Sequence, residues 1–296
     1  MSAIATPLAP LDQGRAGFRQ SLVAEWTKFR SVRSTWVSLS ILIVAAIGLA
    51  ALVTALQANH WKTGTLQDRF NFDPLRYSQA GHFVNQFVVG VLGVLIVSAE
   101  YTTGSIRTTL AATPRRLTVL LAKGTVLTAI LFLLSEAVAF ISFLLSEAIL
   151  KGAGGMLLAP GTTIRGQISA AHAPYLTLSS PGAAAALFRS GLFLVLLALV
   201  AFGIAWIIRN TTGSISLFVG ILLVLPLILQ LLPSSFAQPI ERYLPINLGT
   251  AMVATSTRHN DFAGTLLSPW AASAVMLLYA LILVGIGAWM LNRRDA

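Results

Sequence analysis

Cysteine is absent from this 296-residue sequence, and charged residues of both signs are scarce. A chain without cysteine forms no disulfide and offers neither a thiolate nucleophile nor a cysteine ligand for a metal. Charged residues make up 10% of the chain, whereas a soluble domain carries about 25%. A deficit of this size excludes an ordinary soluble domain and favours a protein that lies in a membrane.

Several sequence signatures of enzymes are missing as well. The chain has no G-x-x-x-x-G-K-[ST] phosphate-binding loop, and it contains no Gly-Lys dipeptide at all. It also lacks an H-E-x-x-H zinc motif and a G-x-S-x-G serine elbow. Its four histidines, at positions 60, 82, 172 and 259, are scattered. We therefore expect no catalytic residue, no metal site and no cofactor bound by this chain.

Long apolar runs dominate the sequence: 56% of the residues are hydrophobic and the mean hydropathy is +0.79. A helix needs about 20 apolar residues to cross a bilayer, and the runs lack the alternating pattern of membrane barrel strands. We predict an all-α polytopic membrane protein in which residues 15–296 form one domain of six transmembrane helices. The predicted spans cover about residues 35–56, 82–99, 117–150, 183–208, 211–232 and 269–291.

Two of the predicted spans have unusual features. The third, as a single helix, would be about 51 Å long, against about 30 Å of hydrocarbon. We expect it either to begin outside the membrane core or to break. The fifth contains Pro226, which should kink it.

The N-terminal segment changes character at residue 15. Residues 1–14 are expected to form a disordered cytoplasmic tail. In residues 15–33, Phe18, Leu22, Trp26 and Phe29 recur at helical spacing, and basic residues surround them. This pattern predicts an amphipathic helix that lies in the membrane interface. The alternative is a helix that packs its apolar side on the rest of the protein.

The basic residues predict the orientation in the membrane. The chain carries 20 lysines and arginines against 10 acidic residues. If both termini are cytoplasmic, the cytoplasmic segments hold twelve basic residues and the outer loops seven, as the positive-inside rule requires. We therefore predict a multi-pass protein of the cytoplasmic (inner) cell membrane with both termini in the cytoplasm. Membrane lipids are the expected partners of these charges, and nucleic acid is not.

A polar stretch between the second and third spans concentrates charge. It comprises Glu100–Arg107 (EYTTGSIR) and Pro114–Arg116 (PRR). Gly104 permits a sharp turn, and Ile106 and Leu110 are spaced to form one face of a short helix. One interpretation is an ordinary turn whose arginines contact lipid headgroups. The other is a docking element that presents polar and basic groups to a soluble partner.

These segments, together with the basic stretch Glu25–Arg33 (EWTKFRSVR) and Tyr243–Pro245 (YLP), resemble the permease subunit of the type-2 family of ABC exporters. The resemblance implies a coupling helix in the loop after the second span, which contacts a separate ABC ATPase subunit. It also implies that ATP and Mg are bound by that ATPase and that the permease pairs with a second copy or a sibling. The coupling residues so implied are Glu100, Tyr101, Thr102, Thr103, Gly104, Ser105, Ile106, Arg107, Pro114, Arg115 and Arg116.

The same resemblance implies alternating access, in which an unidentified amphiphilic or drug-like substrate is moved out of the cell. In that family the second and fifth helices line the central path. The candidate path residues are therefore Asn85, Gln86, Phe87, Ser214, Ser216 and Phe218. The alternative for each of them is packing inside one protomer.

Besides Lys123, which is counted as cytoplasmic, three charged residues fall inside predicted spans, where an unpaired charge costs about 2.5–3.5 kcal/mol. Glu147 and Arg189 both lie near the outer ends of antiparallel helices, and we predict that they form a structural ion pair. Glu136 lies deeper and lacks that partner. It either contacts a cationic or proton-coupled substrate, as a speculative path residue, or is neutral and hydrogen-bonded.

Two other classes of function remain open beside the exporter permease. An ion- or proton-coupled secondary transporter would use Glu136 and would need no ATPase. A membrane-embedded enzyme would need a nucleophile or a metal set, which the sequence does not display. Co-purification with an ATPase separates the first class from the other two.

Overall fold

The computed structural model describes residues 17–61, 63–65, 68–69, 72–113, 115–157, 172–255 and 266–293. The predicted tail at 1–14, Arg15 and Pro114 lie outside the described residues. Within the described chain, six helical segments are long and apolar enough to cross a membrane. They are α2 (Arg33–His60), α5 (His82–Thr102), α7 (Arg116–Gly152), α8 (Ala183–Ile208), the α9–α10 segment (Thr211–Gln230) and α14 (Pro269–Arg293).

The prediction of a helical multi-pass membrane protein is thus confirmed, with each of the six helical segments overlapping a predicted span. The only strands in the described residues are β1 (Met156–Leu157) and β2 (Pro174–Tyr175), which pair in parallel in the second long loop. Four of the six helical segments end two to four residues beyond the predicted limits. Hydropathy marks only the apolar part of a helix, whereas helical hydrogen bonds continue into polar flanks such as Ala99–Thr102.

Two tryptophans on α14 mark a membrane-sized distance. Trp270 and Trp289 are 61% and 55% exposed. Nineteen residues of helix separate them, which corresponds to about 28 Å along the axis. Tryptophan gathers at both membrane–water interfaces, and the hydrocarbon core is about 30 Å thick. The exposed ring at each end of α14 therefore fits the two edges of a bilayer.

Helix α8 forms the centre of the bundle, and α5, α7 and α14 pack around it. It approaches α5 closely at Gly93, where an added Cβ would lie 2.3 Å from the carbonyl oxygen of Ala198. Small residues allow helix backbones to come this close in membrane proteins. Phe202 and Trp206, near the end of α8, are completely buried and stack edge to face.

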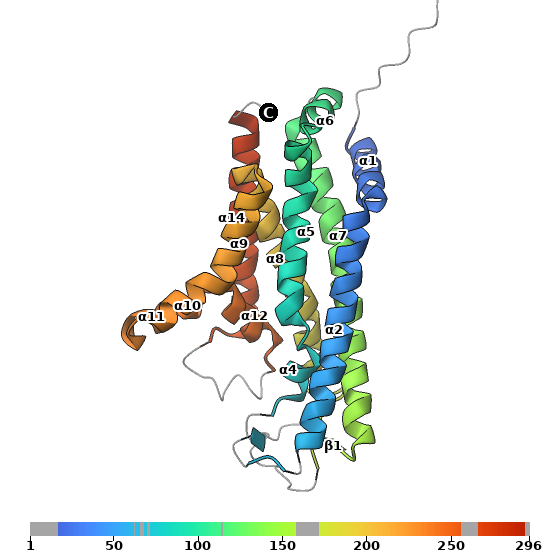
Figure 1. Cartoon of the computed structure of the whole chain (residues 1–296), viewed down its shortest axis with the longest axis vertical. Coiled ribbons are helices and arrows are strands. Elements are labelled where there is room, and N and C mark those ends of the chain that lie inside the picture. Colours follow the sequence, from blue (N-terminus) through green and yellow to red (C-terminus); the bar gives the residue numbers. More distant parts are fainter. Residues whose placement is uncertain are drawn as a thin grey trace, which may run out of the picture.

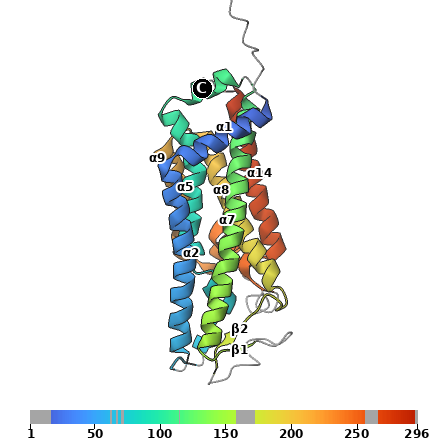
Figure 2. The same ribbon diagram turned by 90° about the vertical axis from the view of Figure 1, so that its right-hand side faces the viewer.

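The predicted third span is the unbroken helix α7 of 37 residues, so of the two expected outcomes the break is wrong. Figures 1 and 2 show α7 running nearly the full length of the molecule, side by side with α2. Its sequence from Leu117 to Lys151 contains no proline to interrupt the hydrogen-bond ladder.

The predicted fifth span bends. It consists of α9 (Thr211–Val219), a π-helical turn η2 (Gly220–Val224) and α10 (Leu225–Gln230). Pro226 lacks a backbone N–H, and the wider π turn lies directly before it. In Figure 1, α10 and the following α11 (Ser234–Glu241) lead away from the bundle, and α12 (Pro245–Val253) returns to it. The sequence reading did not predict α11, whose eight residues include Pro239.

The molecule has two distinct ends (Figure 1). One end holds α1 (Phe18–Ser31), α6 (Ile106–Ala112) and the last turn of α14; we call it the α6 end. The opposite end holds α4 (Pro74–Ser78) and the β1–β2 pair. The predicted arrangement, in which both terminal segments and the 100–116 loop share one side, agrees with this placement.

Helix α1 lies across the bundle, in front of the ends of α5, α8 and α7 (Figure 2). Its buried residues are polar, namely Ser21 and Glu25. Phe18, Val23 and Trp26 are exposed instead. Phe29, however, packs against the hydrophobic core, so the apolar side of α1 is divided between the exterior and the rest of the chain, and the alternative considered for this segment holds for part of it.

Candidate functional site

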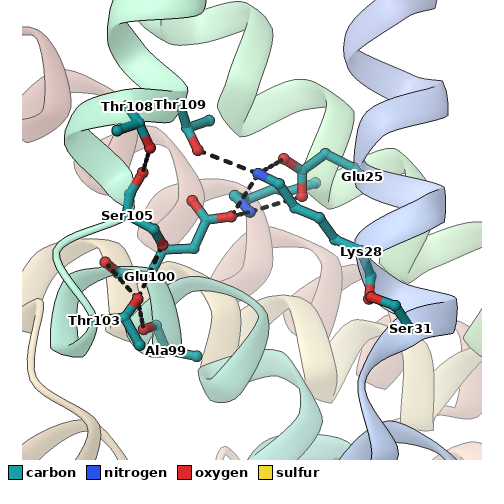
Figure 3. Close-up of polar contacts among 10 residues, drawn as sticks. Glu25, Lys28, Ser31, Ala99, Glu100, Thr103, Ser105, Thr108 and Thr109 are labelled. Atoms are coloured by element: carbon teal, nitrogen blue, oxygen red, sulfur yellow. Dashed lines mark hydrogen bonds and ion pairs between the residues drawn. The ribbon is translucent and has the colours of Figure 1, made fainter.

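Four charged side chains meet where α1 crosses α5 and α7. The ammonium of Lys123 lies 2.7 Å from a carboxylate oxygen of Glu25 and 2.7 Å from one of Glu100. The ammonium of Lys28 lies 3.0 Å from the other Glu25 oxygen and 2.8 Å from the same Glu100 oxygen. We call Glu25, Lys28, Glu100 and Lys123 the four-charge cluster. Figure 3 shows Glu25 and Lys28 reaching from α1 towards Glu100.

The four-charge cluster is largely removed from solvent and electrically balanced. The side chains of Lys123 and Glu25 are 1% and 4% exposed, and that of Glu100 is 11% exposed. Charges buried to this extent are tolerated only when they are paired and hydrogen-bonded. Two ammonium groups face two carboxylates here, so the cluster holds α1, α5 and α7 together without leaving a net charge.

Lys28 extends the four-charge cluster to α6. Its ammonium also donates a hydrogen bond to the hydroxyl of Thr109 at 3.2 Å (Figure 3). Burial alone would lower the pKa of Lys28, but the hydrogen bond to Glu100 and the charge of Glu25 outweigh it and raise that pKa. Lys28 is therefore charged at neutral pH and ties the short helix α6 to α1.

The local sequence explains how these residues meet. Ser21, Glu25 and Lys28 are spaced four and three residues apart, so they lie on one face of α1. Glu100 lies in the last turn of α5 and Lys123 near the start of α7. The intervening turn is formed by Gly104, whose φ of 72° favours glycine. The predicted short helix follows directly as α6, with Ile106 buried in the core.

Some of the predicted coupling residues are buried, and others are exposed at the surface. Glu100 and Ile106 are buried, and Tyr101 stacks edge to face on Trp206. The Glu100 carboxylate binds Lys28 and Lys123 inside the chain, so its side chain does not form part of the exposed surface of this loop. Thr102, Thr103, Gly104, Arg107 and Arg115 are exposed, and Ser105 is half-buried.

Arg116, another predicted coupling residue, binds within the chain. It donates a hydrogen bond to the Leu291 carbonyl at 2.9 Å, and Arg209 donates one to the Met290 carbonyl at 3.1 Å. Both carbonyls belong to the last turn of α14, where cations stabilise the unpaired C=O groups. Arg209 also lies over the ring of Tyr101. These two arginines therefore fasten the end of α14 to the segments before α7 and after α8.

The exposed surface of residues 102–115 is polar and basic. It offers Arg107 and Arg115 among small or hydroxyl side chains, and none of its described residues is an exposed large hydrophobic. Around it the α6 end also exposes Arg19, Arg30, Arg33 and Arg293. The acidic residues of the described chain at this end, Glu25 and Glu100, are both buried in the four-charge cluster. The end therefore presents a positive surface.

A cavity of about 260 Å³ lies among α1, α6 and α7. Its polar lining comprises Ser21, Glu25, Lys28, Thr108, Thr109 and Thr113. Lys28 already donates to three partners and Glu25 binds a lysine with each oxygen. Three of the hydroxyl groups are engaged as well: Ser21 donates to the Gly17 carbonyl, Thr108 donates to the Ser105 carbonyl and Thr109 accepts from Lys28.

The predicted Glu147–Arg189 ion pair is wrong. Glu147 pairs with Lys151, one turn along the same helix. Arg189 donates to the carbonyls of Met252 at 2.9 Å and Ala254 at 3.0 Å, and its guanidinium lies over the Trp270 ring. Because these carbonyls end α12, a buried cation there is stabilised by the end of a helix rather than by a carboxylate.

Most candidate path residues are packed inside the chain. Asn85, Gln86, Ser214 and Phe218 are buried, and Phe218 packs against Gly90 of α5. These four residues therefore pack inside one protomer, which is the alternative considered for them in the sequence analysis. Phe87 is half-buried and Ser216 exposed. Glu136, the seventh candidate, lies against Gly191 between α7 and α8.

The sequence alone did not identify the partners of the Glu100 carboxylate, which are Lys28 on α1 and Lys123 on α7. Lys123 carried a usable signal, because a lysine within an apolar helix needs an acidic partner.

In the described residues no group of three histidine, aspartate or glutamate side chains could hold a metal ion. Comparison of the chain with protein-family models and with curated proteins finds no match.

Proposed function

We propose that this chain is the permease subunit of an ATP-driven exporter of the type-2 ABC family. The observation that carries the proposal is a short helix, α6, held between the second and third spans at a basic end of the molecule. In this arrangement the α6 end and both termini face the cytoplasm of the inner cell membrane. A separate ABC ATPase subunit binds ATP and Mg, and a second permease copy or a sibling completes the transporter.

The two exposed surfaces of the α6 end suit different partners. Helix α1 exposes Phe18, Val23 and Trp26 beside Arg19 and Arg30, as expected of a helix that lies among lipid headgroups. The surface of residues 102–115 has arginines without large apolar side chains, so it has nothing to insert into a membrane. We assign it to the ATPase subunit, which would present an acidic surface to Arg107 and Arg115.

The four-charge cluster provides a physical route from α6 to the spans. A displacement of α6 acts on Lys28 through Thr109, and Lys28 is bound to Glu100 at the end of α5. Helix α5 in turn is joined to α9 through hydrogen bonds of Thr211 with Thr102 and Ser98. ATP-driven movement would therefore shift α5 and α9 together, and an amphiphilic or drug-like substrate would cross by alternating access.

A proton- or ion-coupled secondary transporter is the second candidate. It is favoured by Glu136, a carboxyl group inside a span with no hydrogen-bond partner in the described chain. Such a transporter would need no ATPase. Stable association with an ATPase subunit therefore distinguishes the two functions.

The test is co-purification of the tagged chain with ATPase subunits from its native host. We expect a complex that hydrolyses ATP, and we expect R107E/R115E to weaken it at least about tenfold, or about 1.4 kcal/mol, through charge repulsion. Arg76, exposed at the opposite end on α4, supplies the control R76E, which should bind normally. Failure of the unmodified chain to retain any ATPase subunit would refute the exporter function.

A further inference from the structure

Glu136 is an isolated carboxyl group within the membrane-spanning part of α7. Neither of its oxygens is exposed to solvent, and neither has a hydrogen-bond partner in the described chain. This differs from every charge of the four-charge cluster, each of which has a partner. A buried carboxyl group without a partner is unusual in native proteins and calls for an explanation.

Helix α8 leaves room for the carboxyl group at one position. A Cβ added to Gly191 would lie 2.6 Å from both Cδ and Oε1 of Glu136 and 3.0 Å from Oε2. Any larger residue at 191 would therefore displace the carboxyl group. The carboxyl thus lies directly on the backbone of α8, and the α7–α8 contact encloses it.

No cation reaches this site from the helices around it. Arg189 is two residues from Gly191, but its guanidinium donates to the carbonyls of Met252 and Ala254 near the end of α12. His82 of α5 binds the hydroxyl of Ser190 at 2.7 Å. The other titratable groups on α7 and the elements packed on it are Arg19, Glu25, Lys28, Arg30, Arg33, His60, Arg76, Tyr77, Glu100, Tyr101, Arg107, Arg116, Lys123, Glu147, Lys151, Tyr175, Tyr279 and Arg293.

None of these groups forms an ion pair or hydrogen bond with Glu136 in the described residues. An ionised carboxylate here would be uncompensated in an apolar environment. A metal cation would need about six oxygen ligands, and helix carbonyls on both sides are engaged in helical hydrogen bonds. A proton needs only the carboxylate itself.

We propose that Glu136 is a proton-binding site within the membrane span. The carboxyl group is protonated while α7 and α8 are packed at Gly191. When the helices separate, the proton passes to water that enters between them, and the carboxylate is left charged. This proposal goes beyond the exporter function and does not depend on the ATPase, since proton binding here follows from the α7–α8 contact.

The test is infrared spectroscopy of the full chain in lipid bilayers, which detects the C=O stretch of a protonated carboxyl group. We expect this band at neutral pH in the unmodified chain and its loss in E136Q, whose side chain has nearly the same shape. The control E147Q changes a carboxylate on the same helix that is paired with Lys151, and it should keep the band. Absence of the band from the unmodified chain, or its persistence in E136Q, would overturn the proposal.

Two further measurements do not depend on the folding of E136Q. G191A places a methyl group against the carboxyl, so we expect the band to shift or to disappear at lower pH than in the unmodified chain. An unchanged band would overturn the role of Gly191. Addition of NaCl at constant pH should leave the band intact; its loss would show that the site binds a cation in place of the proton.

Discussion

Lys123 shows how much a single buried charge depends on its neighbours. It lies on a membrane-spanning helix, is 1% exposed and binds two carboxylates from two other helices. Lys28 binds the same two carboxylates but is 43% exposed. Removal of Lys123 therefore leaves two buried carboxylates that share Lys28 alone within the cluster. After removal of Lys28, Lys123 still pairs with both carboxylates, and water can partly replace Lys28.

We predict that K123M lowers the free energy of unfolding by about 3–5 kcal/mol, as expected when one partner of a buried ion pair is removed. K28M should cost much less. The triple variant E25Q/E100Q/K123M should recover a large part of the loss, because it also removes the two carboxylates that K123M leaves with one lysine between them. Unfolding titrations in detergent measure all three, and equal effects of K123M and K28M would contradict this account.

The sequence separation between two residues decides whether their contact could be predicted from the sequence. The Glu100–Lys123 distance is a local consequence of the α5–α6–α7 hairpin. Glu25 lies 98 residues from Lys123, and it reaches Lys123 only because α1 crosses the bundle with its polar side inward. Hydrophobic periodicity gives no crossing direction. The Glu147–Arg189 prediction failed for another reason, because it did not weigh Lys151, four residues away on the same helix face.

At the scale of elements, the ends of helices explain the positions of three arginines near the spans. Arg116 and Arg209 bind carbonyls in the last turn of α14, and Arg189 binds carbonyls at the end of α12. Hydropathy predicted the six long helices because each needs about 20 apolar residues. It could not predict α12 or α11, whose positions depend on such tertiary contacts rather than on an apolar run.

We predict that R189Q loosens α12 while E147Q does not. Loss of the guanidinium leaves the Met252 and Ala254 carbonyls with weaker partners, so the helix end should open more often. Hydrogen–deuterium exchange of residues 245–254 should become about tenfold faster in R189Q, which corresponds to about 1.4 kcal/mol of local stability. Equally faster exchange in E147Q would indicate that Glu147 and Arg189 interact, which would contradict the structure.

At the scale of the whole molecule, charge and aromatic residues define two different ends. The α6 end exposes six arginines, and its described carboxylates are buried. The exposed tryptophans of α14 lie about 28 Å apart, close to the thickness of a bilayer core. The positive-inside rule applied to these arginines is the basis of the proposed orientation, in which the α6 end faces the cytoplasm.

This orientation can be tested because the chain has no cysteine of its own. We predict that T63C, at the end opposite α6, reacts with a membrane-impermeant thiol reagent in intact cells. T108C, on the exposed side of α6, should react only after the cells are permeabilised. The reverse pattern would place α6 outside the cell, away from ATP.

The same two variants give the most direct measurement of the central claim, that α6 docks an ATPase. A thiol-to-amine cross-linker should join T108C to an ATPase subunit in native membranes, and T63C should yield no such product. The cross-link from T108C should also diminish in the R107E/R115E background. If T108C is expressed and labelled but never cross-links to an ATPase, α6 is not a coupling helix and the exporter account is contradicted.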